Sequence, residues 1–237
     1  MLAFALHGLL GSLAVSSLKL SSTKRPIRVL VVEGMELIRA GLVQIISAVS
    51  NLVVCATTGG CDDVEDLVER HRPRLVIVEP FQQNRDGITW IRDLAARFPQ
   101  TRILVVSSKA EITYAERALR AGASGYWMKN GSADELLRAI DKVLNDEIYL
   151  SPKIALLAVD RFVGRNLNGC EDFSNLTDRE LHVFSLIGAG HGVGRIADEL
   201  GISRKTVETY CERIKSKLGY SDAGALKRGA RDFLTAA

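Results

Sequence analysis

The distribution of hydrophobic and polar residues divides the chain into two parts. Between residues 27 and 145, short β-branched apolar runs alternate five times with longer amphipathic stretches. The apolar runs are typical of strands buried on both faces, and the amphipathic stretches are typical of helices that cover them. The expected strands are residues 27–32, 52–57, 74–79, 102–107 and 124–128, and the expected helices are residues 35–49, 62–71, 87–97, 111–121 and 132–145. Right-handed crossovers then predict an α/β domain with a five-stranded, parallel, doubly wound sheet.

Residues 174–237 carry the pattern of a small all-α domain. Thr177 and Glu180 form a capping box, which predicts a helix that begins just after Thr177. A glycine-rich stretch at residues 188–194 ends this helix. A short second helix follows, and Gly201 marks a tight turn before the third.

The third helix, residues 204–218, has two contrasting faces, and Ser203 can cap it. Its apolar positions recur at helical spacing, which predicts a buried stripe of Val207, Cys211, Ile214 and Leu218. The opposite face is polar or charged and carries Lys205, Thr209, Glu212 and Ser216. Two helices joined by a tight turn are the plan of a helix-turn-helix motif. An ordinary three-helix bundle with a solvated face has the same periodicity and is the alternative.

The overall charge indicates little by itself about partners. The 237 residues carry a formal net charge of +3, and residues 174–237 hold ten Lys and Arg against eight Asp and Glu, a balance of +2. If the helical domain binds nucleic acid, its affinity must therefore rest on a few well-placed cations and on dimerisation. The four cysteines form no metal-binding spacing and are expected to be reduced thiols.

Residues 1–25 differ from the rest, since they are apolar and uncharged up to Lys19. They lack the positive segment that begins a signal peptide, and they are short for a membrane span. We expect a disordered leader or a start codon chosen in error, with a weak membrane-binding or partner-binding segment as the alternative. The expected organisation is a first domain at 26–149, a linker at 150–173 and a second domain at 174–237.

Four polar residues follow strands of the expected sheet, namely Glu33, Glu79, Ser107 and Lys129. Function in parallel sheets collects at the carboxyl ends of the strands, so we expect these side chains to share one pocket. Two carboxylates, a hydroxyl and an ammonium suit a phosphoryl group or a cation. They suit an internal salt bridge equally well.

The run LTDRELHVFSLIGAGHGVGRIADELGISRKTVETYCERIKSKL resembles the LuxR/GerE-type DNA-binding domain over some forty residues. The matching positions are Leu176, Thr177, Glu180, Gly190, Ile196, Ala197, Leu200, Ile202, Ser203, Thr206, Val207, Lys217 and Leu218. The resemblance implies a four-helix domain whose third helix enters the major groove. It also implies that the last helix, with a start that Ser221 can cap and an apolar face of Ala225, Leu226 and Phe233, makes the contact in a homodimer.

The candidate DNA-binding residues lie on the third helix and on the helix before it. Thr206, Glu208, Thr209 and Glu212 are candidates for base edges, because a glutamate accepts a hydrogen bond from cytosine. Lys205, Arg213, Lys217 and Arg195 are candidates for phosphate contacts, which position the domain without reading sequence. Ser203 and Val207 complete the set that the resemblance carries over. For Glu212, pairing with a neighbour such as Lys215 at the solvent face is the alternative.

Residues 27–150 resemble the receiver domain of NarL/FixJ-type response regulators, through VVEGMELIRAGL, LVIVEPFQQNRDGI, RILVVSS and RALRAGASGYWMK. The resemblance implies a flavodoxin-like fold. It matches Ser107 and Lys129 to the conserved hydroxyl and lysine. The sequence departs from the receiver pattern at two places. Glu33 and Gly34 occupy the positions of the two acidic residues that follow the first strand in receivers, and Glu79 occupies the position of the phosphorylated aspartate. The spacing to Asp86 and Gly87 confirms this register.

These departures change the expected chemistry. Phosphoryl transfer to a carboxylate needs Mg²⁺ in near-octahedral geometry. Because one carboxylate is missing and two are longer by a methylene, we expect no bound metal and no ordinary phosphorylation switch. Glu79 is expected to pair with Lys129 instead. In the alternative, Glu79 still accepts phosphate, with Glu33 and Glu79 as the ligands of Mg²⁺.

Two further features follow from the receiver resemblance. Tyr126 occupies the position of the aromatic residue that reports the state of the pocket, and a half-buried Tyr on an edge strand is the alternative. Residues 112–129 form the face that receivers often use to dimerise.

The sequence therefore predicts a cytoplasmic DNA-binding transcription regulator of the two-component type, with duplex DNA, a second copy of the chain and a sensor kinase or other protein as partners. No sequence motif of a nucleotide-binding or hydrolytic enzyme is present, so we expect no enzyme, no cofactor and no membrane association. A protein-binding adaptor with weak or conditional DNA binding is the alternative.

Overall fold

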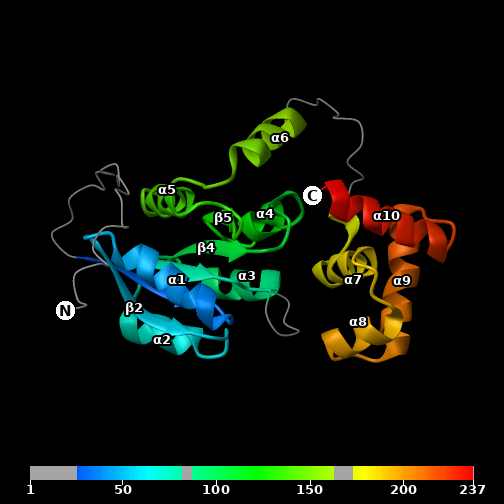
Figure 1. Ribbon diagram of the computed structural model, residues 1–237, viewed down its shortest axis with the longest axis horizontal. Coiled ribbons are helices and arrows are strands. Elements are labelled where there is room, and N and C mark those ends of the chain that lie inside the picture. Colours follow the sequence, from blue (N-terminus) through cyan, green and yellow to red (C-terminus); the bar gives the residue numbers. More distant parts are fainter. Residues whose placement is uncertain (1–25, 82–86, 163–172, 237) are drawn as a thin grey trace, which may run out of the picture.

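The computed structural model describes residues 26–81, 87–162 and 173–236 (Figure 1). The expected leader at 1–25 and residues 163–172 of the expected linker at 150–173 lie outside the described residues.

The N-terminal domain is the expected doubly wound α/β domain. Its parallel sheet has the strand order β2-β1-β3-β4-β5, with β3 at the centre between β1 and β4 (Figure 1). The strands are β1 Ile27–Val32, β2 Leu52–Thr58, β3 Leu75–Val78, β4 Arg102–Ser107 and β5 Gly125–Met128. The helices are α1 Glu36–Ser47, α2 Val64–His71, α3 Gly87–Arg97, α4 Glu111–Arg120 and α5 Ala133–Leu144. The predicted order of strands and helices is confirmed.

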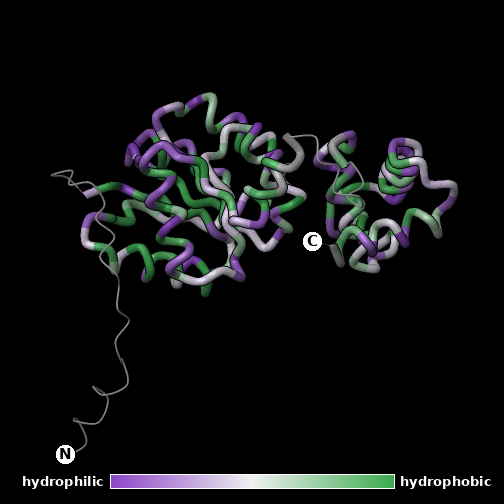
Figure 2. Tube along the Cα trace, turned by 90° about the horizontal axis from the view of Figure 1, so that it is seen from above, coloured by the Kyte–Doolittle hydropathy of each residue, from purple (hydrophilic) through white to green (hydrophobic). Residues whose placement is uncertain are grey.

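The helices cover both faces of the sheet. Side chains of α1 and α5 pack on one face, and side chains of α2, α3 and α4 pack on the other. The central strand β3 is apolar and buried along its whole length because both of its faces are covered. Figure 2 shows hydrophobic residues concentrated in the interior of this domain. Helix α6, Pro152–Phe162, follows this domain within the expected linker.

The C-terminal domain is all-helical, as predicted. It contains a short 3-10 turn at Phe173–Asn175 and the helices α7 Asp178–Gly188, α8 Val193–Leu200, α9 Arg204–Leu218 and α10 Ala223–Ala236. The capping box of Thr177 and Glu180 is formed at the start of α7. Gly201 ends α8 with φ of +61°, a conformation that favours glycine, and Ser203 caps α9 by accepting from the Thr206 amide.

The expected cap of the last helix is corrected by one residue. The Ser221 hydroxyl donates to the carboxylate of Asp222, and the Asp222 carboxylate accepts from the Ala225 amide at 2.8 Å. Asp222 is therefore the residue that satisfies the free amides at the start of α10, because its side chain reaches the third helical residue.

Helix α10 packs closely on α7. A Cβ at Gly188 would lie 2.2 Å from the carbonyl oxygen of Ala230, so only glycine permits this approach. Leu226 and Phe233 are buried, and Phe233 contacts Phe173 and Phe184. The apolar face of α10 is thus used inside the domain, and its exposed residues include Lys227, Arg228 and Arg231.

No described helix has both the length and the apolar character needed to cross a membrane.

Candidate functional site

The four polar residues that follow the strands of the sheet do share one pocket. Glu33 follows β1, Glu79 follows β3, Ser107 ends β4 and Lys129 follows β5. The strands are parallel, so their carboxyl ends meet at one edge and bring the four side chains together. Glu33, Glu79 and Ser107 are all buried, which removes the two carboxylates from water.

The ammonium of Lys129 lies between the two carboxylates. Its Nζ is 2.6 Å from Oε2 of Glu33 and 3.1 Å from Oε2 of Glu79. The remaining carboxylate oxygens are also engaged, since Oε1 of Glu33 accepts from the Met35 amide and Oε1 of Glu79 accepts from the Ser107 hydroxyl. Buried charges persist when they are paired and hydrogen-bonded in this way. The expected pair of Glu79 and Lys129 is present, and Glu33 joins it.

The pocket does not have the ligand set that Mg²⁺ requires. Gly34 offers no side chain, and the Lys129 ammonium takes up carboxylate oxygens of Glu33 and Glu79 that would have to face a metal ion. Among the described residues, no three His, Cys, Asp or Glu side chains gather where they could hold an ion. Divalent cations need several oxygen ligands with open coordination, so these residues do not fit a metal.

Ser107 connects this pocket to the loop before α4. Its hydroxyl donates to Glu79 at 3.0 Å and accepts from the Lys109 amide at 3.1 Å. The Tyr126 hydroxyl donates to the Lys109 carbonyl at 2.7 Å, and the Tyr126 ring is fully buried rather than half-buried at an edge. Burial raises the pKa of Tyr126 well above its ordinary value, although the Ser107 hydroxyl opposes this. The pocket and the loop therefore form one hydrogen-bonded unit.

Helix α9 has the predicted two faces. Of the predicted buried stripe, Val207 and Ile214 are completely buried, whereas Cys211 and Leu218 are only partly buried and pack against the core. The exposed residues of its outer face are Lys205, Glu208, Thr209, Glu212, Arg213 and Ser216. In Figure 1, α7 faces the N-terminal domain and α9 lies on the far side of α7. The polar face of α9 is therefore available to a partner.

Several predicted DNA-binding residues also have structural roles. Val207 belongs to the core, so its side chain cannot reach a groove. Ser203 caps α9 and lies 2.8 Å from the Thr206 hydroxyl. Glu212 pairs with Lys215 at 2.9 Å, which is the alternative that the sequence left open. Arg195 of α8 is exposed.

Lys217 is tied to α7 by an ion pair. Its ammonium lies 2.6 Å from the carboxylate of Glu180, which is itself buried and forms the capping box with Thr177. Burial would raise the pKa of Glu180, but hydrogen bonds from Lys217 and Thr177 outweigh it and lower the pKa. This pair fixes the end of α9 on α7.

Arg204 was not among the residues predicted to bind DNA. This residue is exposed at the first position of α9, and its guanidinium lies over Gly194 of α8, where a Cβ would come within 3.3 Å. Its place directly after the cap Ser203 was the signal that could have identified it.

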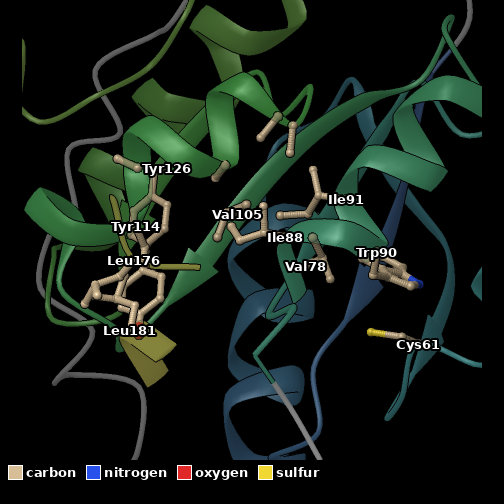
Figure 3. Close-up of a cluster of buried hydrophobic side chains, with 14 of the residues drawn as sticks. Cys61, Val78, Ile88, Trp90, Ile91, Val105, Tyr114, Tyr126, Leu176 and Leu181 are labelled. Atoms are coloured by element: carbon tan, nitrogen blue, oxygen red, sulfur yellow. The ribbon is translucent and has the colours of Figure 1, made fainter. Parts of the chain in front are cut away.

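The two domains also make a contact that was not predicted from the sequence. The guanidinium of Arg117 in α4 lies 2.7 Å from the carboxylate of Asp178 in α7 and donates to the Phe173 carbonyl at 2.7 Å. Tyr114, one turn earlier, packs on Phe81 with ring centroids 4.8 Å apart. Figure 3 shows Tyr114 beside Leu176 and Leu181 of the C-terminal domain, and all belong to one apolar cluster. Part of the face expected to dimerise, residues 112–129, therefore contacts the chain's own second domain.

Comparisons with known proteins agree with both halves of this description. Residues 29–141 match the response regulator receiver domain family, and residues 174–226 match the luxR family of bacterial regulatory proteins. The response regulator GacA of Pseudomonas aeruginosa is 31% identical over 193 residues, which cover 81% of this chain and 89% of GacA. The oxygen regulatory protein NreC of Staphylococcus aureus is 29% identical over 197 residues, which cover 81% of this chain and 91% of NreC.

A solved structure shares the fold over both domains. RcsB from Salmonella enterica serovar Typhimurium, bound to a promoter in the presence of the phosphomimetic BeF3−, matches with a TM-score of 0.62 at 19% identity. The match covers 87% of this chain and 98% of the RcsB chain. At this identity the likeness supports the fold alone.

Proposed function

Because the chain belongs to the response regulators that join a receiver domain to a LuxR-type DNA-binding domain, we propose that it binds duplex DNA through α9 as a homodimer and regulates transcription. The observation that carries this proposal is the exposed polar face of α9, held on a completely buried stripe of Val207 and Ile214. A rigidly seated helix with a free polar face is what major-groove recognition requires. This family consists of transcription factors rather than enzymes.

The exposed side chains of α9 divide by chemistry into two roles. Thr209 and Glu208 have short or carboxylate side chains that suit base edges. Lys205, Arg213 and the neighbouring Arg204 suit phosphates, and Arg195 of α8 extends the same role. Glu212 is held by Lys215 and Lys217 by Glu180, so we assign these two a smaller part in DNA binding.

We also propose that the receiver pocket is not switched by ordinary phosphorylation. The triad of Lys129 with Glu33 and Glu79 supports this, because it already satisfies the charges that a receiver pocket leaves for a metal ion and a phosphoryl group. Control of DNA binding then rests on protein level, on a partner or on another signal. A sensor kinase that acts through Glu79 is the alternative.

The DNA-binding proposal is tested with the purified protein and a pool of random duplexes. We expect a selected duplex whose affinity, followed by fluorescence anisotropy, falls steeply with salt, by about 0.9 log units per log unit of salt for each phosphate contacted. In a Lys205→Met variant, the slope of log affinity against log salt concentration should become shallower by the amount expected for about one phosphate contact.

Two results would contradict the proposal. One is the selection of no duplex, which favours the adaptor alternative. The other is binding that salt does not weaken, since phosphate contacts release counterions.

A further inference from the structure

His182 of α7 lies where the two domains meet. It lines a small crevice with Lys109 and Tyr114 of the receiver domain and with its own neighbours Asp178 and Arg179; Phe81 and Gly87 complete the lining. Its enclosed space holds about one water molecule. The imidazole is therefore part of a close contact between domains.

The charged groups around the imidazole disfavour a proton on it. Lys109, from the loop before α4, and Arg179, from α7, are the two cations that act on it. The acid of the crevice is Asp178, and its carboxylate is engaged by Arg117 at 2.7 Å. Tyr114 contributes a neutral hydroxyl, because burial raises its pKa to about 12 while the Ser185 hydroxyl opposes the shift. Among the described residues of the crevice, an imidazolium would thus meet two cations and one carboxylate that is already paired.

Burial and these two cations all lower the pKa of His182. Burial first, and then Lys109 and Arg179, lower the pKa of His182 from 6.5 to about 4. When the domains separate, His182 faces water and Lys109 moves away, so its pKa returns toward the ordinary value. Protonation therefore favours the separated domains.

We propose that the contact between α4 and α7 is an acid-released latch, closed while the imidazole of His182 is neutral and opened when this imidazole gains a proton. The latch holds Tyr114 and Arg117 of α4 against α7 and leaves the polar face of α9 uncovered. Acid thus exposes the face of α4 and lets the DNA-binding domain move relative to the receiver domain. It does not change the exposure of α9, which is uncovered in the closed form as well. Dimers of such domains read half-sites about one helical turn apart, and a separated domain can adjust its position to that spacing.

The size of the effect follows from proton linkage. The imidazole of His182 binds a proton more tightly when the domains are separated than when they are in contact. The closed form therefore has its full stability above about pH 6.5 and loses it as the pH falls toward 4. With pKa values of 6.5 open and about 4 closed, the ratio of closed to open protein falls roughly twentyfold between pH 7 and pH 5.

The latch is tested by small-angle X-ray scattering of the full chain at pH 7 and pH 5. We expect the radius of gyration of the wild type to rise at pH 5, and that of His182→Gln, which cannot gain a proton, to stay the same at both values. His71→Gln, the same change on α2, controls for general acid effects and should behave as the wild type. Arg117→Asp breaks the pair with Asp178 and provides the open reference at both pH values, with circular dichroism as the check that it folds.

A wild type that is equally compact at pH 7 and pH 5, or a His182→Gln variant that still expands in acid, would overturn the latch. A second measurement rests on the proposed function. On a duplex with two half-sites, acid should tighten binding by the wild type about tenfold more than binding by His182→Gln, within the range of allosteric coupling. Scattering needs no DNA, so failure of the latch and failure of DNA binding give different results.

Discussion

The ammonium nitrogen of Lys129 lies 2.6 Å from Oε2 of Glu33 in the pocket at the carboxyl ends of the strands. Gly34, which follows Glu33 in the chain, contributes no side chain to this pocket. A lysine that would face a phosphoryl group is thereby committed to a carboxylate of its own chain. The same ammonium reaches Glu79 at 3.1 Å, so one internal cation bridges both acids. Lys129, Glu33 and Glu79 therefore form one internal ion-pair network.

Removal of the shared cation should destabilise the receiver domain. Lys129→Met leaves Glu33 and Glu79 buried without their partner, and the expected loss is about 3–5 kcal/mol in the free energy of unfolding. Urea denaturation measures it. Lys142→Met, the same change at an exposed position of α5, should stay within about 0.5 kcal/mol of wild type. Equal effects of the two changes would show that the network contributes no stability.

Restoration of the receiver pattern should create a metal site. The triple variant Glu33→Asp, Gly34→Asp and Glu79→Asp supplies three shorter carboxylates, which leave room for an ion and for Lys129 to face a phosphoryl group. We expect calorimetric titration with Mg²⁺ to show binding by this variant and none by the wild type. If both bind Mg²⁺ with similar affinity, the longer side chains and Gly34 are not what closes the pocket.

The contact of α7 with α10 should tolerate no side chain at Gly188. In Gly188→Ala, the new Cβ meets the Ala230 carbonyl at 2.2 Å, and the forced separation should cost about 1–3 kcal/mol in the free energy of unfolding. Gly41→Ala in α1 is the matched control, because nothing lies within 4 Å of its Cβ. That control should be stabilised by roughly 0.5–1 kcal/mol, since alanine is the better helix former. Thermal unfolding of both variants shows whether each is stabilised or destabilised relative to wild type. A Gly188→Ala variant more stable than wild type would contradict the close packing of α7 on α10.

Two lysines of α9 should differ in their roles. Lys217→Met removes the partner of buried Glu180, so it should lower stability and change the salt slope of DNA binding little. Lys205→Met should leave the free energy of unfolding unchanged. It should make the salt dependence of DNA affinity shallower by the amount expected for about one phosphate contact. Because the pKa of Glu180 is lowered in the folded protein, the stability that this pair adds is present above the ordinary pKa of about 4.5 and is lost as the pH falls through the folded value. Denaturation at several pH values and anisotropy at several salt concentrations separate the two lysines; a reversed pattern would show that Lys217 faces the DNA.

Much of the fold was predictable because its signals are local. The β-branched runs that became β1 to β5, the capping box of Thr177 and the left-handed Gly201 each depend on a few neighbouring residues. The pocket of Glu33, Glu79 and Lys129 was also predictable, since parallel strands bring their carboxyl ends to one edge.

What the sequence could not predict depends on contacts between distant elements. The pair of Arg117 with Asp178 joins residues 61 positions apart, and no periodicity indicates it. The same holds for the pair of Lys217 with Glu180, which turned a candidate phosphate contact into a link between helices. The cap of α10 was misplaced by one residue because Ser221 and Asp222 are both good capping residues, and only the backbone geometry selects between them.

The most direct test of the central proposal is the affinity of the purified protein for its selected duplex, measured by anisotropy with and without beryllofluoride and Mg²⁺. If the network of Lys129, Glu33 and Glu79 closes the pocket, the two affinities should be equal, and the state of dimerisation by sedimentation should not change. Tighter binding with beryllofluoride, abolished in Glu79→Gln, would contradict this and show that the pocket still works as a phosphate switch.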